Sequence, residues 1–186
     1  MPPTSIPESL RSMFARSPIA LSLSPATPDH VLMLVNRSFE DLSGYSNADI
    51  VGRNCRFMQG GLAQEEALRP VRHFVADASV PSVRAPLINF RADGRPFVNL
   101  LYMSRLRSSS GEDCFFFASQ FDISRSNQDT LAQYDGALAS TVSHLHSPAA
   151  ASGFTIDGSV QTLGNSLALI AQAKLTLDSL DIAHGL

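Results

Sequence analysis

Residues that can do chemistry gather in the first two thirds of the chain, and Cys55 stands in the densest group. It lies between Asn54 and Arg56, so a potential nucleophile is flanked by an amide and a permanent positive charge. A second arginine, Arg72, follows in a segment with a helical pattern. A guanidinium offers a planar fork that matches phosphate oxygens. Arg56 and Arg72 are therefore predicted to hold the phosphate of a bound nucleotide-like cofactor.

Two asparagines and a glutamine lie in segments with strand-like composition. Asn89 and Asn99 are equidistant from Gly94 in a turn signal, so we predict that they face each other directly across an antiparallel hairpin. Gln120 belongs to the following strand, and buried amides require polar partners such as the edge of a ring system. Strand alternation predicts apolar neighbours on the same faces, namely Leu87, Leu101, Met103, Phe116 and Ala118.

Five strands and three helices are predicted to position these side chains. Short helices are expected around Phe39–Leu42 and after Ser46, and one long helix over Leu62–Ala76. The predicted strands cover residues 19–23, 31–35, 83–90, 97–106 and 114–123. Because the helices fall between the second and third strands, we predict an α+β PAS fold, with a five-stranded antiparallel sheet and helices on one side.

Segments on either side of this core complete the predicted organisation. Residues 1–17 are expected to form an N-terminal cap, 18–124 the core and 125–186 a C-terminal helical extension. Apolar residues at helical spacing predict two helices in the extension, over residues 126–146 and 158–181, with Pro148 and Gly153 between them.

Composition restricts the class of protein. The net charge of −3 provides no basic surface for nucleic acid. The N-terminal residues resemble neither a signal peptide nor a membrane anchor, so we expect a cytoplasmic protein that binds no membrane. Cys55 and Cys114 lack the spacing of a zinc site, and no metal is expected.

The segment Gly52–Gly60, with the sequence GRNCRFMQG, closely resembles the signature of light-oxygen-voltage (LOV) domains, which usually have leucine where this chain has Met58. The resemblance extends over roughly residues 17–124 and includes Leu87–Phe90, Phe97–Leu101 and Gln120–Asp122. On these motifs the chain is identified as a member of the LOV photoreceptors of the PAS superfamily. Because roughly 60 residues follow the core, we expect a short LOV protein without an effector domain.

This resemblance implies a function and a cofactor. LOV domains bind FMN and sense blue light through a reversible bond between a cysteine sulfur, here Cys55, and flavin carbon C4a. It places Asn89 and Asn99 at the pyrimidine edge and Gln120 near the flavin carbonyl and nitrogen N5. When N5 gains a proton, Gln120 would present its carbonyl oxygen and pass the change to the tail. Positions carried over as further flavin contacts are Asn54, Arg56, Gln59, Arg72, Leu101, Met103 and Phe116.

Three positions depart from the common pattern of the family. Leu23, Leu101 and Ala118 stand where a small polar residue, an aromatic and a glycine are frequent, and all three are expected to line or approach the flavin. These departures are expected to affect how fast the bond between Cys55 and the flavin breaks in the dark.

Other interpretations of the sequence lead to different chemistry. A PAS module can bind haem through a helical histidine, for which His73 is the candidate. A small flavin oxidoreductase would require a nicotinamide fingerprint, which the sequence lacks, so we expect no enzyme. A ligand-free PAS module would leave the polar residues of the sheet to packing alone.

The C-terminal extension is expected to carry a signal away from the core. Its apolar stripes favour a partner helix, and we expect a homodimer that responds to light, together with a downstream protein partner whose identity the sequence does not reveal.

Overall fold

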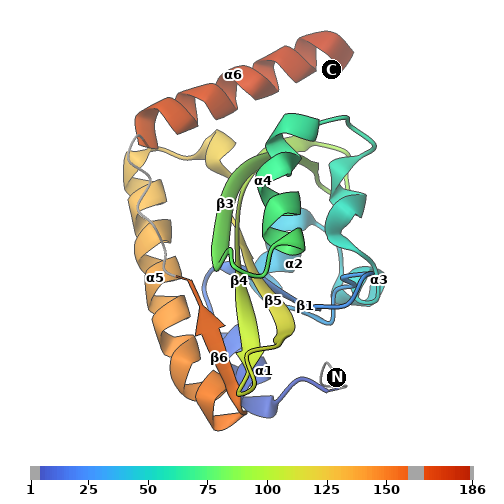
Figure 1. The fold of residues 1–186 in the computed structure, drawn as a ribbon. Helices are drawn as coiled ribbons and strands as arrows, with labels where there is room; N and C mark the ends of the chain where they lie inside the picture. The colour runs from blue at the N-terminus through green and yellow to red at the C-terminus, as the bar shows by residue number, and fades with distance from the viewer. Residues whose placement is uncertain (1–4, 159–165, 185–186) are drawn as a thin grey trace.

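A computed structural model describes residues 5–158 and 166–184 of the 186-residue chain. It contains a single antiparallel sheet flanked by helices (Figure 1). The strands are β1 (Ala20–Pro25), β2 (Leu34–Val35), β3 (Ser82–Phe90), β4 (Pro96–Ser108), β5 (Asp113–Gln120) and β6 (Phe154–Asp157). The helices are α1 (Glu8–Arg16), α2 (Arg37–Ser43), α3 (Asn47–Ile50), η1 (Cys55–Gln59), α4 (Glu65–Ala76), η2 (Ile123–Arg125), α5 (Gln128–Ala151) and α6 (Ser166–His184).

The sheet has the strand order β2-β1-β5-β4-β3. Each neighbouring pair is antiparallel, which confirms the predicted α+β PAS-type sheet of five strands. A sixth strand that we did not predict, β6, pairs with the end of β4 that extends beyond β3. The long strand β4 therefore has β3 and β6 side by side along one edge.

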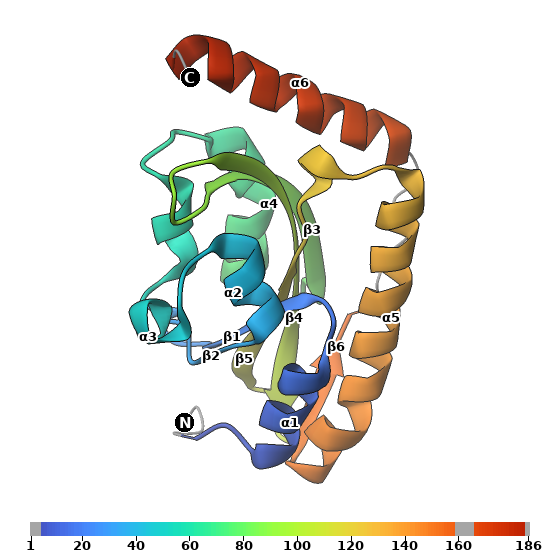
Figure 2. The same cartoon turned by 180° about the vertical axis from the view of Figure 1, so that it is seen from behind.

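Two helical layers cover the two faces of the sheet (Figures 1 and 2). We call the face beneath α2, α3, η1 and α4 the inner face, and the face beneath α1 and α5 the outer face. Alternation along β1 separates them, because Leu21 and Leu23 join the core with α1 and α5, whereas Ser22 and Ser24 line a cavity on the inner face.

Asn36 joins the N-terminal helix to the sheet and starts α2. Its Oδ1 accepts hydrogen bonds from the backbone of Leu21 (2.9 Å) and Phe39 (3.1 Å), which makes it the N-cap of α2. Its Nδ2 donates to Phe14 (3.2 Å) and Ile19 (2.8 Å) carbonyls. One buried amide thus fixes the entry of α2 relative to α1 and β1.

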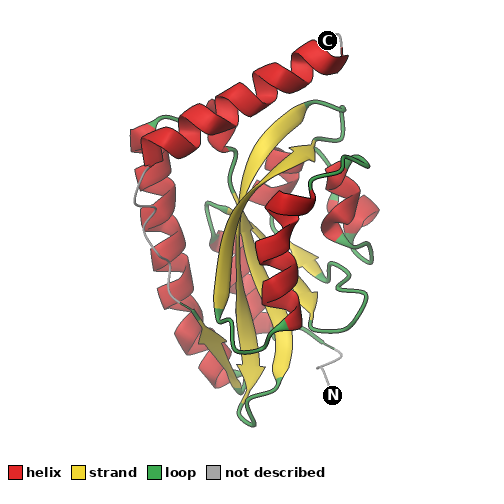
Figure 3. Ribbon diagram, turned by 45° about the horizontal axis from the view of Figure 1, so that its top comes forward, coloured by secondary structure: helices red, strands yellow, loops and turns green. Residues whose placement is uncertain are grey.

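The C-terminal extension differs from the prediction (Figure 3). Instead of ending near residue 146, α5 continues through Pro148 to Ala151, because Leu145 and Ala149 are fully buried and their packing outweighs the bond that proline removes. The segment after Gly153 forms β6. We predicted that the last helix starts at residue 158, but residues 159–165 lie outside the described part of the chain. The helix that the structure describes, α6, ends at His184.

Candidate functional site

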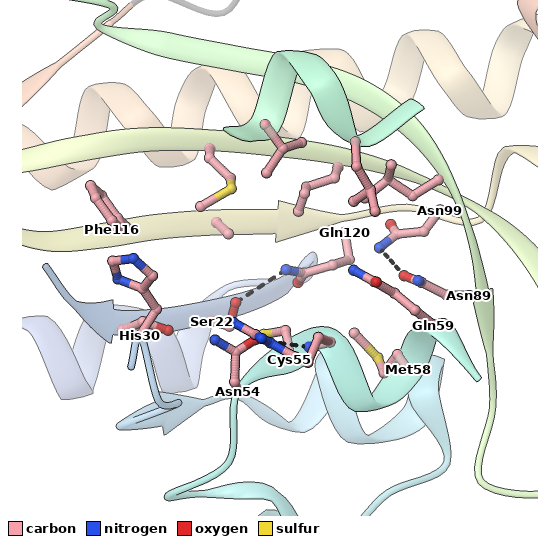
Figure 4. Close-up of a pocket in the computed structure, with 18 of the residues that line it drawn as sticks. Ser22, His30, Asn54, Cys55, Met58, Gln59, Asn89, Asn99, Phe116 and Gln120 are labelled. Atoms are coloured by element: carbon pink, nitrogen blue, oxygen red, sulfur yellow. Dashed lines mark hydrogen bonds between the residues drawn. The ribbon is translucent and has the colours of Figure 1, made fainter. Parts of the chain in front are cut away.

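A cavity of about 420 Å³ lies between the inner face of the sheet and the helices η1 and α4 (Figure 4). Its volume is within the range of small-molecule pockets. The residues that line it are Ser22, Ser24, His30, Asn54, Cys55, Arg56, Met58, Gln59, Leu68, Val71, Arg72, Val75, Leu87, Asn89, Asn99, Leu101, Met103, Phe116, Ala118 and Gln120.

The short helix η1 presents Cys55 to this cavity. Its N-cap is Asn54, whose Oδ1 accepts from the Arg56 backbone at 3.0 Å and whose Nδ2 donates to the Asp29 carbonyl at 2.8 Å. It ends at Gly60, which has a left-handed φ of 59° and has no room for a Cβ, since such an atom would lie 2.6 Å from the ring of Phe90. The cysteine is therefore held at both ends of its helix.

Burial reinforces the protonated state of Cys55. Its removal from water disfavours the thiolate and raises the pKa of the thiol from 9.0 to about 12, although a backbone hydrogen bond acts in the opposite direction. The side chain is half-buried, and it lines the cavity. At neutral pH the cavity thus contains a neutral thiol that carries its own proton.

One end of the cavity holds an amide pair. Asn99 Nδ2 donates to Asn89 Oδ1 at 2.9 Å, and Asn99 Oδ1 accepts from the backbone of Phe121 at 3.2 Å. The predicted register was wrong, because Asn99 lies opposite Leu87 and Asn89 opposite Phe97. The hairpin is centred on residue 93, so the partners shift by two positions, and both amides keep the same face.

Gln120 has an incompletely satisfied side chain at the inner face. Its Nε2 donates to Ser22 Oγ at 3.1 Å, while its Oε1 is buried and has no hydrogen-bond partner among the described residues. Buried carbonyl oxygens normally have partners. This oxygen can therefore accept a hydrogen bond from a group bound in the cavity.

Arg56 and Arg72, which we predicted to bind a phosphate, both border the cavity but differ in their side-chain partners. Arg72 forms a bidentate ion pair with Glu65, seven residues or about two turns earlier on α4, and this hydrogen-bonded contact lowers the pKa of that carboxyl. Arg56 is exposed and forms no side-chain hydrogen bond or ion pair with the residues that the structure describes. A phosphate would have to compete with Glu65 for Arg72 but not for Arg56.

The structure brings all eleven predicted site residues to this one cavity. These are Asn54, Cys55, Arg56, Gln59, Arg72, Asn89, Asn99, Leu101, Met103, Phe116 and Gln120. The expectation for Leu23 was wrong, because it is fully buried beneath the outer face, whereas its neighbours Ser22 and Ser24 line the cavity. The alternation of leucine and serine in β1 would have revealed this.

Further lining residues were not predicted as site residues. Those from the helices are Met58, Leu68, Val71 and Val75, and His30 comes from the loop between β1 and β2. Conversely, His73, the candidate haem ligand, is exposed on α4 and does not line the cavity. No group of three or more potential metal-ligating side chains occurs within residues 5–158 and 166–184, and no helix in those ranges is long and apolar enough to cross a bilayer.

This set of residues fits a flavin mononucleotide. The amide pair can bind the polar edge of the ring system, and the walls beside it are apolar side chains such as Leu101 and Met103. The partnerless oxygen of Gln120 can accept from a ring nitrogen, and the arginines at the rim can hold a phosphate.

Comparisons with known proteins agree with this geometry. The PAS domain family matches residues 19–125, more than half of the chain. Blue-light-activated histidine kinase 1 of Erythrobacter litoralis is 39% identical over 106 residues, which cover 56% of this chain and 29% of that protein. Phototropin-1A of Oryza sativa is 29% identical over 143 residues, or 75% of this chain and 15% of that protein. The chain therefore spans less than a third of the length of either relative.

A solved structure matches nearly the whole chain. The crystal structure of the Rhodobacter sphaeroides LOV protein has a TM-score of 0.69 and 27% sequence identity, and the match covers 94% of this chain and 95% of that one. The likeness therefore includes the helices outside the PAS match. On its fold, its GRNCRFMQG segment and these relatives, the chain belongs to the PAS domain family and carries a LOV domain.

Proposed function

We propose that this protein is a blue-light receptor that binds FMN in the inner-face cavity and forms a reversible covalent bond through Cys55. The observation that carries the proposal is that the Cys55 thiol and the partnerless Gln120 Oε1 line the same cavity. Relatives named as blue-light-activated kinases support the light-sensing role. We do not attribute their kinase activity to this chain. We propose that it acts as a sensor and catalyses no reaction.

The protonated thiol suits the proposed reaction. A flavin, when bound, absorbs blue light and becomes electrophilic at ring carbon C4a. Cys55 would supply both atoms that are required, because its S–H bond would break, the sulfur would bond to that ring carbon and the proton would pass to the adjacent ring nitrogen N5. Because the raised pKa of about 12 keeps the proton on sulfur, no other reactant is needed. Reversal in the dark would break the carbon–sulfur bond and return the proton to the Cys55 sulfur.

Absorption spectroscopy with cysteine variants tests this proposal. The purified protein should be yellow, bleach under blue light and recover in darkness. Cys55→Ala should retain the flavin and lose the reversible bleaching. Cys114→Ala is the matched control, because Cys114 is buried in the outer-face core away from the cavity, and it should bleach like the parent. Unaltered bleaching in Cys55→Ala would refute the proposed bond.

We infer that Arg56 and Arg72 select FMN over riboflavin by binding its phosphate. Charge-assisted hydrogen bonds contribute roughly 1.5–3 kcal/mol each. The double change to alanine should therefore reduce the preference for FMN by at least about tenfold. Arg69→Ala is the control, because Arg69 pairs with Glu66 on the same helix and does not line the cavity. Equal preference in parent and double variant would contradict this assignment.

Gln120 is our proposed link between the cavity and the tail. If N5 becomes a donor, Gln120 Oε1 can accept from it, and any rotation of the amide disturbs the bond to Ser22. The next residue, Phe121, stacks on Tyr134 of α5 with ring centroids 4.3 Å apart. Gln120→Leu should bleach normally but blunt light-induced changes in hydrogen exchange of α5. A full response in this variant would place the link elsewhere.

We further propose that α6 carries the signal to a second copy of the chain. Leu167 and Leu175 are each 60% exposed and, eight residues apart, lie on neighbouring parts of one helix surface. Leu167→Glu with Leu175→Glu should shift the protein toward monomer in size-exclusion chromatography, compared in darkness and under blue light. An unchanged elution volume in both conditions would remove α6 as the dimer surface.

The two free cysteines suit the reducing interior of a cell, where we place the receptor.

A further inference from the structure

The cavity has two chemically different ends (Figure 4). Asn89 and Asn99 lie at one end, whereas His30 and Phe116 lie at the other, with Cys55 between them. A flavin ring system has one edge of hydrogen-bonding atoms and an opposite hydrocarbon edge. Because the amide pair suits the first edge, the hydrocarbon edge faces His30 and Phe116.

His30 is held in a conformation that residues with a side chain seldom adopt. Its φ of 43° is the only positive value at a non-glycine residue in the described part of the chain. Such a conformation costs roughly 1–2 kcal/mol, and strain of this kind concentrates at functional sites. The backbone N–H donates to Thr27 at 3.0 Å, and the ring Nδ1 lies 3.4 Å from the Pro25 carbonyl oxygen. The strained turn directs the imidazole toward the cavity.

The ring of Phe116 beside His30 is backed by further buried side chains. The ring centroid of Phe116 lies 5.2 Å from that of His30. The ring of Phe74 packs against Phe116, with the two centroids 5.4 Å apart. Behind both rings is the guanidinium of Arg105, which is 1% exposed and donates to the Val80 and Asp77 carbonyls at 2.9 Å. His30, by contrast, is half-buried in a loop, so a shorter side chain there would open the cavity to solvent.

Building on the FMN site proposed above, we propose that His30 determines specificity at the hydrocarbon edge of the flavin. Its ring closes that end of the cavity and excludes flavins whose ring carries a substituent larger than methyl. A well-packed apolar pocket discriminates against one extra methylene by roughly 10- to 200-fold. The substrate class selected is therefore flavin mononucleotide with the ordinary methyl groups.

Competition between two flavins tests His30 directly. The full chain is refolded with equal concentrations of FMN and an analogue that carries a dimethylamino group in place of the methyl at ring position 8, and the bound flavins are extracted and quantified. The parent should retain FMN in at least about tenfold excess. His30→Asn should reduce the excess to within about threefold, because asparagine tolerates the left-handed backbone but is shorter. His73→Asn, the same change on an exposed residue, should behave like the parent.

The outcomes separate this inference from the proposed function. A parental ratio in His30→Asn, or equal uptake of both flavins by the parent, would overturn the role of His30. Retention of neither flavin by the parent would instead contradict the FMN site itself. His30→Gly relieves the positive φ altogether, so it carries the same test if His30→Asn folds poorly.

Discussion

The two faces of the sheet are built from neighbouring residues but are filled in different ways. On the outer face, Phe115 and Phe117 are fully buried in the core that includes α1, α5 and β6. On the inner face, Phe116 and Gln120 border a cavity of about 420 Å³. The buried Oε1 of Gln120 lacks a partner among the described residues and borders the cavity, where a ligand can supply a donor. The comparison indicates that the outer face provides stability and that the inner face reserves its groups for a bound molecule.

The largest expected effect concerns the reactivity of Cys55 on the inner face. A shift of its pKa from 9.0 to about 12 lowers the thiolate fraction at pH 8 by about a thousandfold, and only the thiolate reacts with alkylating agents. In the flavin-free folded protein, the alkylation rate of Cys55 should rise tenfold per pH unit from pH 7 to pH 11. In urea it should level off above pH 9. Peptide mass spectrometry separates Cys55 from Cys114, and a plateau near pH 9 in the folded protein would contradict the burial effect.

Truncation of adjacent phenylalanines compares the two faces directly. Phe117→Ala should lower the free energy of unfolding by about 3–5 kcal/mol, because its ring packs edge-on against Phe14 and Tyr102. Phe116→Ala should lower it by about 2 kcal/mol, because one side of that ring already borders the cavity. Urea denaturation of the flavin-free protein measures both. Equal losses would show that the inner face is packed as tightly as the outer one.

Glycine substitutions after η1 sharpen the description of the inner face. Gly60→Ala should destabilise the fold by about 2–3 kcal/mol, because the new methyl meets Phe90 in addition to the strained backbone. Gly61→Ala shares a left-handed φ, 74°, but meets no atom within 4 Å, and should cost only about 1–2 kcal/mol. Thermal denaturation and flavin occupancy of both variants provide the measurement. Similar values for the two would mean that Phe90 yields without cost.

The smallest effect is expected for one hydrogen bond on the outer face. The hydroxyls of Ser119 and Tyr134 lie 3.0 Å apart, and burial raises the pKa of this tyrosine to about 12. Tyr134→Phe keeps the stack on Phe121 and should cost about 0.5–1.5 kcal/mol in urea denaturation. Ser119→Ala should cost a similar amount, and the double variant little more than either alone. Fully additive losses would show that the two hydroxyls do not interact.

Much of the site was predictable because its residues are fixed by short motifs and by strand alternation. The GRNCRFMQG segment and the amides on β3, β4 and β5 identified eleven residues that line one cavity. Alternation tolerates an error of two residues in register, since such a shift keeps every side chain on its face. This is why Asn89 and Asn99 were correctly placed together although their partners were not.

The features that the sequence did not predict depend on contacts between distant segments. His30 lines the cavity because a turn in the left-handed region directs it there, and no periodic pattern encodes that turn. The strand β6 has only four residues and forms because the far end of β4 offers a free edge. Pro148 normally ends a helix, but burial of the surrounding turn against α1 overrides its local preference.

The position of β6 affects how this domain can be divided or fused to other proteins. The PAS match ends at residue 125, which invites a cut there to obtain a minimal light-sensing module. Such a cut would leave one edge of Arg105–Ser108 without the strand β6 and uncover the apolar outer face, which is a combination that promotes aggregation. Engineered fusions should therefore retain α5 and β6 and attach their cargo after α6.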